Sequence, residues 1–147
     1  MWIDDVRVIT PQQTLSGATI VVGPEGKFVY VGPRAEVPAD LPEASQLRGR
    51  TVVPGFIDIH THGGVGHTFG QGSDLAGALK RYSRWVASTG VTGFLCTLSA
   101  PDTEALRSML TAYVALFAEA DFPGARPLGL HLEGPYLSPE KKGAFNA

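Results

Sequence analysis

The segment "PGFIDIHTHGGVG" (residues 54–66) places two histidines one residue apart, directly after a short apolar run. Residues 56–60 predict a short buried β-strand. Side chains alternate along a strand, so His60 and His62 leave its C-terminal end toward the same face. Two imidazoles on one face can reach one metal ion, and such a site needs further ligands from elsewhere in the chain.

The chain beyond this segment alternates between strand and helix patterns. Residues 56–60, 92–98 and 127–133 predict three evenly spaced strands, which is typical of consecutive βα units and a parallel sheet. The sheet is then either doubly wound or closed into a barrel. A nucleotide-binding doubly wound sheet carries GxGxxG or GxxxxGK[ST] after its first strand. Neither motif follows here, so we expect an α/β barrel.

Two amphipathic helices are expected between these strands. Ser73-Asp74 provides an N-terminal cap for the first, which ends before Gly90. Asp102 or Thr103 caps the second, which Pro123-Gly124 stops.

Residues 1–53 have a different pattern and predict a small β-domain. Short β-rich runs at 2–10, 17–23 and 26–32 are separated by proline and glycine, and "GPEG" (residues 23–26) predicts a hairpin turn. Residues 33–48 are richer in proline and charge and are expected to form a loop. Pro54-Gly55 marks the predicted boundary with a second domain, residues 54–147.

The composition excludes several classes of protein. The 147 residues are 44% hydrophobic, and their formal net charge of −2 argues against an electrostatic nucleic-acid binder. The first residues are too acidic for a signal peptide, and no apolar stretch is long enough to span a membrane. Cys96 is the single cysteine, so no internal disulfide can form. We therefore expect a cytoplasmic protein without nucleic-acid or membrane partners.

Glu133 supplies the further ligand that the histidines need. It ends the third predicted strand, where a buried carboxylate is costly unless it is paired, protonated or coordinated. His60, His62 and Glu133 thus form a partial site for a divalent transition metal such as zinc, iron or manganese. The alternative is an ion pair between Glu133 and Lys141 or Lys142.

Other residues in this part of the chain are expected to have supporting or structural roles. His131 shares a strand face with Glu133 and is expected to support the site rather than to bind metal. His67 is expected to be a solvated loop residue. Asp58 either orients an imidazole or packs in the sheet. Cys96 is expected in the core.

Three motifs carry a resemblance to a known family. "PGFIDIHTHGG", "TGVTGFLCTL" and "GLHLEGPYLSPEKKGA" resemble the amidohydrolase superfamily and, within it, the N-acetylglucosamine-6-phosphate deacetylase family. The resemblance covers the whole chain and implies a small β-sandwich before a metal-dependent (β/α)8 barrel. Residues 1–53 would be part of the sandwich, and residues 54–147 the first three strands and two helices of an incomplete barrel.

The resemblance also assigns roles to individual residues. It implies that Glu133 ligates the catalytic metal and that His60 and His62 hold a second ion, so one or two divalent ions are expected. Ala144 and Phe145 match positions that touch the substrate sugar. Many relatives carry histidine or another polar residue at the second of these, and Phe145 departs from that pattern.

The activity implied is the deacetylation of N-acetylglucosamine 6-phosphate to glucosamine 6-phosphate and acetate. The acid/base aspartate of this family is expected beyond residue 147, so no catalytic residue is assigned here. A complete barrel needs about 250 residues. We therefore expect the N-terminal portion of a larger protein, which is inactive alone. The resemblance implies a homodimer at full length.

Two other readings remain open. One is a different amidohydrolase, such as a hydrolase of N-acyl amino acids or cyclic amides. The other is a non-catalytic truncated fragment that retains a metal-binding half-site or a partner surface.

Overall fold

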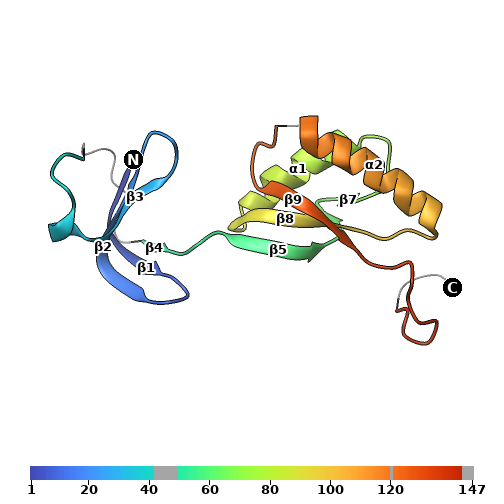
Figure 1. The fold of residues 1–147 in the computed structure, drawn as a ribbon, viewed down its shortest axis with the longest axis horizontal. Helices are drawn as coiled ribbons and strands as arrows, with labels where there is room; N and C mark the ends of the chain where they lie inside the picture. Colours follow the sequence, from blue (N-terminus) through green and yellow to red (C-terminus); the bar gives the residue numbers. More distant parts are fainter. Residues whose placement is uncertain (42–49, 120, 144–147) are drawn as a thin grey trace. The chain divides into compact units, whose positions relative to one another are not determined.

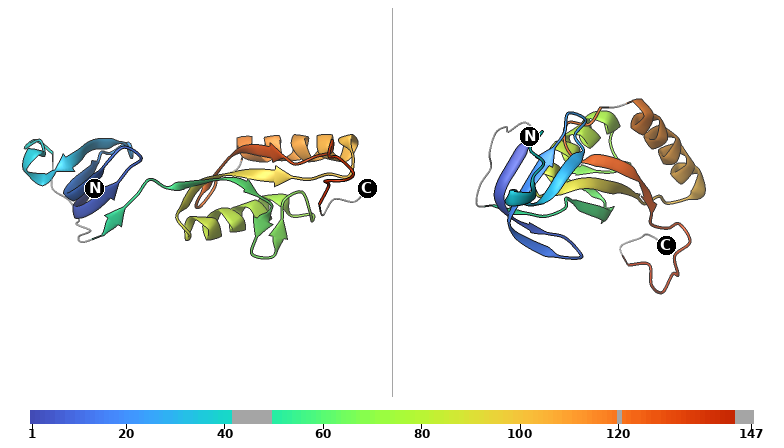
Figure 2. Two further views of the ribbon diagram at one scale, coloured as in Figure 1. Left: turned by 90° about the horizontal axis from the view of Figure 1, so that it is seen from below. Right: turned by 60° about the vertical axis from the view of Figure 1, so that its left-hand side comes forward.

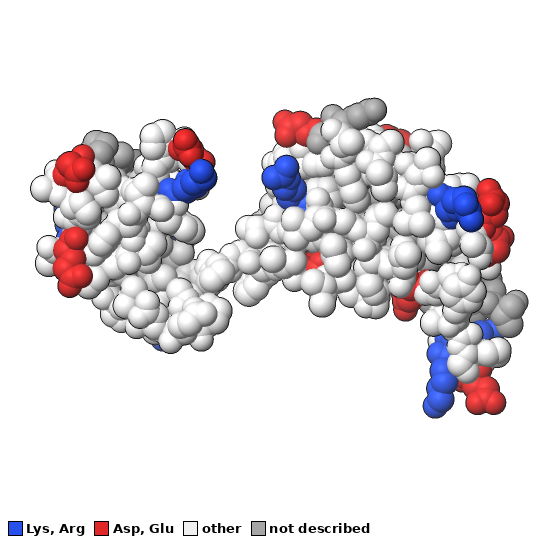
Figure 3. Space-filling view, in the orientation of Figure 1, with Lys and Arg blue, Asp and Glu red and all other residues white. Residues whose placement is uncertain are grey.

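The computed structural model describes residues 1–41, 50–119 and 121–143, which divide between Pro54 and Gly55 into two compact units. Each unit has its own sheet and its own hydrophobic core. The described chain is mixed α/β, as the sequence predicts. Acidic and basic side chains are interspersed on the face of the second unit that is seen in Figure 3.

The first unit is built on one sheet with the strand order β3-β2-β1-β4 (Figure 1). The antiparallel part contains β1 (Trp2–Ile9), β2 (Thr14–Val22) and β3 (Phe28–Pro33). The short strand β4 (Thr51–Val52) pairs with β1 in parallel. A 3-10 helix, η1 (Arg34–Glu36), follows β3.

The three predicted β-runs of this unit are confirmed as strands. The "GPEG" turn is confirmed as well, since Gly23 N–H donates to the Lys27 carbonyl at 2.9 Å. The sequence did not predict β4, because two residues are too few to show a period. Part of the expected loop, residues 42–49, lies outside the described residues, and η1 occupies part of the rest.

A buried carboxylate lies beside the core of the first unit, which contains Val6, Val8, Ala18 and Ile20. Asp4 accepts a hydrogen bond of 2.6 Å from the Thr19 hydroxyl and pairs with Arg34. The bond from Thr19, more than the charge of Arg34, holds the pKa of Asp4 below its ordinary value. Asp4 is therefore a satisfied buried charge.

The second unit contains a parallel sheet with the strand order β5-β8-β9 (Figure 1). Its strands are β5 (Phe56–Thr61), β8 (Val91–Leu98) and β9 (Arg126–Leu132). Helix α1 (Leu75–Ala87) connects β5 to β8, and α2 (Thr103–Glu119) connects β8 to β9. A small hairpin of β6 (Gly63–Gly64) and β7 (His67–Thr68) lies between β5 and α1. The chain after β9 leaves the sheet as a loop (Figure 2).

Both helices begin at predicted caps. The Asp74 carboxylate accepts the Gly77 N–H at 2.8 Å, and Asp102 accepts the Ala105 N–H at 2.8 Å. Each bond satisfies one of the donors that a helix start leaves unpaired, which is why an aspartate is favoured there. Helix α1 ends at Ala87, before Gly90.

The core of the second unit is centred on β8. Phe94, Cys96 and Leu98 are fully buried and pack in one cluster with Tyr82 of α1 and Tyr113 of α2. Burial raises the pKa of the Cys96 thiol to about 12, so the thiol is protonated and inert at neutral pH. The prediction that Cys96 belongs to the core is confirmed.

The prediction that residues 56–60 form a buried strand is wrong in one respect. They form β5, but Ile57 and Ile59 are 60% and 67% exposed. In the described part of the chain, β5 pairs with β8 alone and so lies at the edge of the sheet. An apolar run of this kind is buried only where other elements cover the faces of the sheet, and the described residues leave Ile57 and Ile59 uncovered.

Candidate metal centre

The candidate ligands come from two strands that lie on either side of β8. His60 and Thr61 end β5, and His62 follows directly. Glu133 follows β9, and its backbone N–H donates to the carbonyl of Leu98, the last residue of β8, at 3.1 Å. Because the strands are parallel, their carboxyl ends meet at one edge of the sheet.

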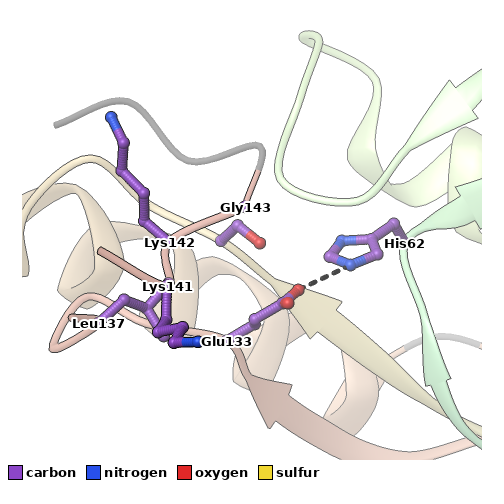
Figure 4. Close-up of a pocket in the computed structure, with 7 residues that line it drawn as sticks. His62, Glu133, Leu137, Lys141, Lys142 and Gly143 are labelled. Atoms are coloured by element: carbon purple, nitrogen blue, oxygen red, sulfur yellow. Dashed lines mark ion pairs between the residues drawn. The ribbon is translucent and has the colours of Figure 1, made fainter. Parts of the chain in front are cut away.

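The structure brings the three predicted ligands together at this edge. The Oε2 atom of Glu133 lies 2.8 Å from Nε2 of His62 and 3.5 Å from Nε2 of His60. One ligand atom from each residue lies within 4.8 Å of the others. Figure 4 shows the Glu133 carboxylate directed at the His62 ring.

This arrangement matches the dimensions of a metal site. Ligand atoms about 2.1 Å from one tetrahedral ion are roughly 3.4 Å apart. The distances from Glu133 to the two imidazoles lie on either side of that value. Two imidazole nitrogens and one carboxylate oxygen suit zinc, iron or manganese. His60, His62 and Glu133 could therefore hold a divalent cation, with further positions left for other ligands.

Glu133 pairs with these imidazoles rather than with a lysine. Within the described residues, no ion pair joins Glu133 to Lys141 or Lys142. Figure 4 shows Lys142 pointing away from the carboxylate. The alternative interpretation, in which a lysine neutralises Glu133, is not what the structure has.

A pocket of about 450 Å³ adjoins the carboxylate (Figure 4). Its walls come from the ends of the strands and from the loop after β9, and they consist of His62, Ser99, Glu133, Leu137, Lys141, Lys142 and Gly143. The predicted sugar contacts, Ala144 and Phe145, follow Gly143 directly and lie outside the described residues.

Two residues near the ligands support them in different ways. The Asp58 carboxylate accepts the backbone N–H of His60 at 3.1 Å, so Asp58 holds the chain rather than an imidazole ring. The His131 ring lies 4.5 Å from the His60 ring, between centroids, and its Nδ1 atom is 3.1 Å from the Thr97 hydroxyl. The ring of His131 is thereby fixed beside a candidate ligand without being one of the three.

The expectation that His67 is a solvated loop residue is wrong. His67 lies in β7, is half-buried, and accepts a hydrogen bond of 2.9 Å from Nε of Arg81. Arg81 also pairs with Asp74 at 3.2 Å. The Gly77 N–H and Arg81 together hold the pKa of Asp74 below its usual value. The sequence could not show this because the partner is a helical residue well beyond the loop.

Sequence reasoning also missed two tyrosines whose hydroxyls contact the end of β5 and the loop after it. The Tyr82 hydroxyl lies 2.9 Å from the Thr61 hydroxyl, and the Tyr113 hydroxyl accepts the Gly70 N–H at 2.8 Å. Both tyrosines belong to the apolar stripes of their helices. A buried tyrosine usually finds a partner for its hydroxyl, which was the available signal.

The second unit matches a family model. The model of the amidohydrolase family matches residues 51–146. This chain belongs to the amidohydrolase family. The superfamily resemblance predicted from the HxH and HLEGP motifs is therefore confirmed.

No helix among the described residues is both long and apolar enough to cross a membrane.

Amidohydrolases of one specificity are prominent among the similar proteins. The chain is 39% identical over 104 residues to N-acetylglucosamine-6-phosphate deacetylase of Homo sapiens, which covers 69% of this chain and 25% of that protein. It is 28% identical over 144 residues to the deacetylase of the same name from Bacillus subtilis, over 97% of this chain and 36% of that protein. The chain therefore spans about a quarter to a third of these relatives.

A solved structure agrees with the sequence matches. The structure of N-acetylglucosamine-6-phosphate deacetylase from Thermotoga maritima superposes with a TM-score of 0.76 at 31% identity. The match covers 99% of this chain and 35% of that one. The predicted resemblance to these deacetylases is confirmed over both units.

Proposed function

We propose that this chain is part of a metal-dependent deacetylase that converts N-acetylglucosamine 6-phosphate to glucosamine 6-phosphate and acetate. The observation that carries the proposal is the convergence of His60, His62 and Glu133 on one point at the carboxyl edge of the sheet. The similarity to deacetylases of this specificity supports the choice of substrate.

In this proposal, separate residues of the chain bind the metal, contact the sugar and attract the phosphate. Glu133 and the imidazoles of His60 and His62 hold one or two divalent ions, with zinc, iron and manganese as the candidates. Such an ion, when bound, polarises a carbonyl and lowers the pKa of bound water. The adjoining pocket receives the sugar, with Ala144 and Phe145 as proposed contacts. Its lysines, Lys141 and Lys142, keep the surroundings positive for a phosphorylated substrate.

The larger architecture is also a proposal. The order β5-β8-β9 with intervening helices is supporting evidence for the opening part of a (β/α)8 barrel, because candidate ligands at carboxyl ends of strands are typical of that fold. We propose that residues 1–53 are part of a β-sandwich and residues 54–147 part of the barrel. The acid/base aspartate would come from elsewhere in a cytoplasmic homodimer, so residues 1–147 alone would be inactive.

The test is acetate release by the purified full-length protein, with and without a chelator. We expect release from N-acetylglucosamine 6-phosphate, its loss with chelator, and its recovery with added metal. N-Acetylglucosamine without phosphate is the matched control for phosphate recognition. Turnover of N-acyl amino acids or cyclic amides instead would favour another amidohydrolase specificity. Metal binding without turnover of any of these compounds would favour a non-catalytic protein.

A further inference from the structure

The sheet is irregular at the residues that carry the candidate ligands. Asp58 pairs with Phe94 and Thr61 pairs with Cys96, so three steps along β5 match two steps along β8. An extra residue of this kind is a bulge, which disrupts the ladder and re-aims the neighbouring side chains. The direction of His60 and His62 is therefore not set by strand pairing alone.

Thr61 provides a second attachment at this point. It stands between the two histidines, and while their imidazoles approach Glu133, its hydroxyl lies 2.9 Å from the hydroxyl of Tyr82. Neighbouring side chains of a strand point to opposite faces, so Thr61 faces the helix layer and the imidazoles face away from it. A bond that fixes Thr61 also fixes the rotation of the chain on both sides of it.

Tyr82 is a rigid anchor for this bond. The residue is 1% exposed, and its ring packs edge-on against Phe69 and Phe94 at centroid distances of 5.0 and 4.9 Å. Burial raises the pKa of Tyr82 above its ordinary value, so the hydroxyl stays neutral and able to donate. The ring has little freedom to follow Thr61 if the strand end rotates.

We infer that Tyr82 is a positioning residue for the metal centre, acting through the Thr61 hydroxyl to aim His60 and His62 at Glu133. The inference rests on the proposed metal role of these three residues. It assigns Tyr82 a task beyond core packing. The task depends on one oxygen atom, which a phenylalanine lacks while keeping the ring.

The experiment is a Co²⁺ titration of the purified, chelator-treated full-length protein, followed by the visible absorption of the bound ion. We expect Tyr82→Phe and Thr61→Val each to weaken Co²⁺ binding about fivefold, the equivalent of one net hydrogen bond, and to alter the absorption band. Thr61→Ser keeps the hydroxyl and should retain the affinity of the wild type. The double variant Tyr82→Phe/Thr61→Val should bind no more weakly than Thr61→Val alone, because the bond that Tyr82→Phe removes is already lost in Thr61→Val.

Ser83→Ala is the matched control. Ser83 neighbours Tyr82 on α1, is fully buried, and donates its hydroxyl to the Ala125 carbonyl at 2.6 Å. It therefore loses a buried hydrogen bond from the same helix, and we expect a lower urea midpoint with unchanged Co²⁺ binding. Unchanged affinity and absorption in Tyr82→Phe, or equal losses in Ser83→Ala, would overturn the inference. A wild-type protein that binds no Co²⁺ would overturn the proposed metal role and this inference with it.

Discussion

Glu133 is the residue on which the candidate centre depends, because one of its oxygen atoms lies within reach of both imidazoles. Its side chain is 31% exposed, and those of His60 and His62 are about half exposed. At such exposure an ordinary carboxylate–histidine pair contributes little stability. A shared cation gives a stronger physical reason for three such side chains to converge.

Replacing Glu133 tests this at the scale of one residue. Glu133→Gln keeps the size of the side chain but removes its charge, so we expect Zn²⁺ binding to weaken by at least about 100-fold, the upper end of what supporting residues alone cost. The measurement is a competition titration against a chromophoric chelator. Glu140→Gln, an exposed carboxylate in the loop after β9, is the control and should bind Zn²⁺ like the wild type. Equal affinities in the two variants would remove Glu133 from the ligand set.

The candidate ligands could be predicted from sequence because their placement follows local rules. Strand alternation put His60 and His62 on one face, and parallel strands put Glu133 at the same edge. The irregularity between Asp58 and Thr61 interrupts the ladder beside His60, so alternation alone did not ensure that the two imidazoles would share a face. The bonds of Tyr82 to Thr61 and of Arg81 to His67 could not be predicted, because they depend on how a helix packs.

At the scale of elements, the β6–β7 hairpin connects the candidate ligands to α1. Gly63 follows His62 and has φ of 120°, and the Phe69 N–H donates to the His62 carbonyl at 2.8 Å. A Cβ atom at Gly63 would overlap the carbonyl oxygen of His67, whereas one at Gly66, whose φ is 81°, would meet nothing within 4 Å. A side chain at Gly66 would cause backbone strain alone, whereas one at Gly63 would cause both backbone strain and steric overlap.

Alanine substitutions at these glycines test whether the hairpin holds His62. Each variant incurs about 1–2 kcal/mol for a side chain at positive φ. Gly63→Ala must also displace the partner strand, so we expect a larger drop in urea midpoint and weaker Zn²⁺ binding. Gly66→Ala should lose stability alone. Equal Zn²⁺ affinities in both variants would show that the hairpin does not position His62.

Other elements show where local sequence signals suffice and where they fail. The caps at Asp74 and Asp102 were predictable because a helix start needs an acceptor two or three residues before its free N–H groups. The exposure of Ile57 and Ile59 was not, because an apolar run does not reveal whether its strand is central or at an edge.

At the scale of the whole molecule, the chain consists of two units with separate cores, and each contains one of its two tryptophans. Trp2 is buried in the first unit, and Trp85 lies on α1 of the second, where its ring is 5.6 Å from the Tyr82 ring. The sequence predicted two parts from the change in pattern at Pro54. Whether the two units also unfold separately depends on the free energy that couples their unfolding, and a local sequence pattern does not show this quantity.

A bound metal ion can separate the two unfolding transitions, because all three candidate ligands belong to the second unit. In a protein that comprises residues 1–147, Trp2→Phe leaves Trp85 as the fluorescent reporter, and Trp85→Phe leaves Trp2. At a Zn²⁺ concentration of 100 times its dissociation constant, binding adds about 2.7 kcal/mol to the free energy of unfolding. We expect the urea midpoint reported by Trp85 to rise and that reported by Trp2 to stay unchanged. Equal shifts in both reporters would mean that the two units unfold in one cooperative transition. Metal bound to the second unit would then also stabilise the first unit against unfolding.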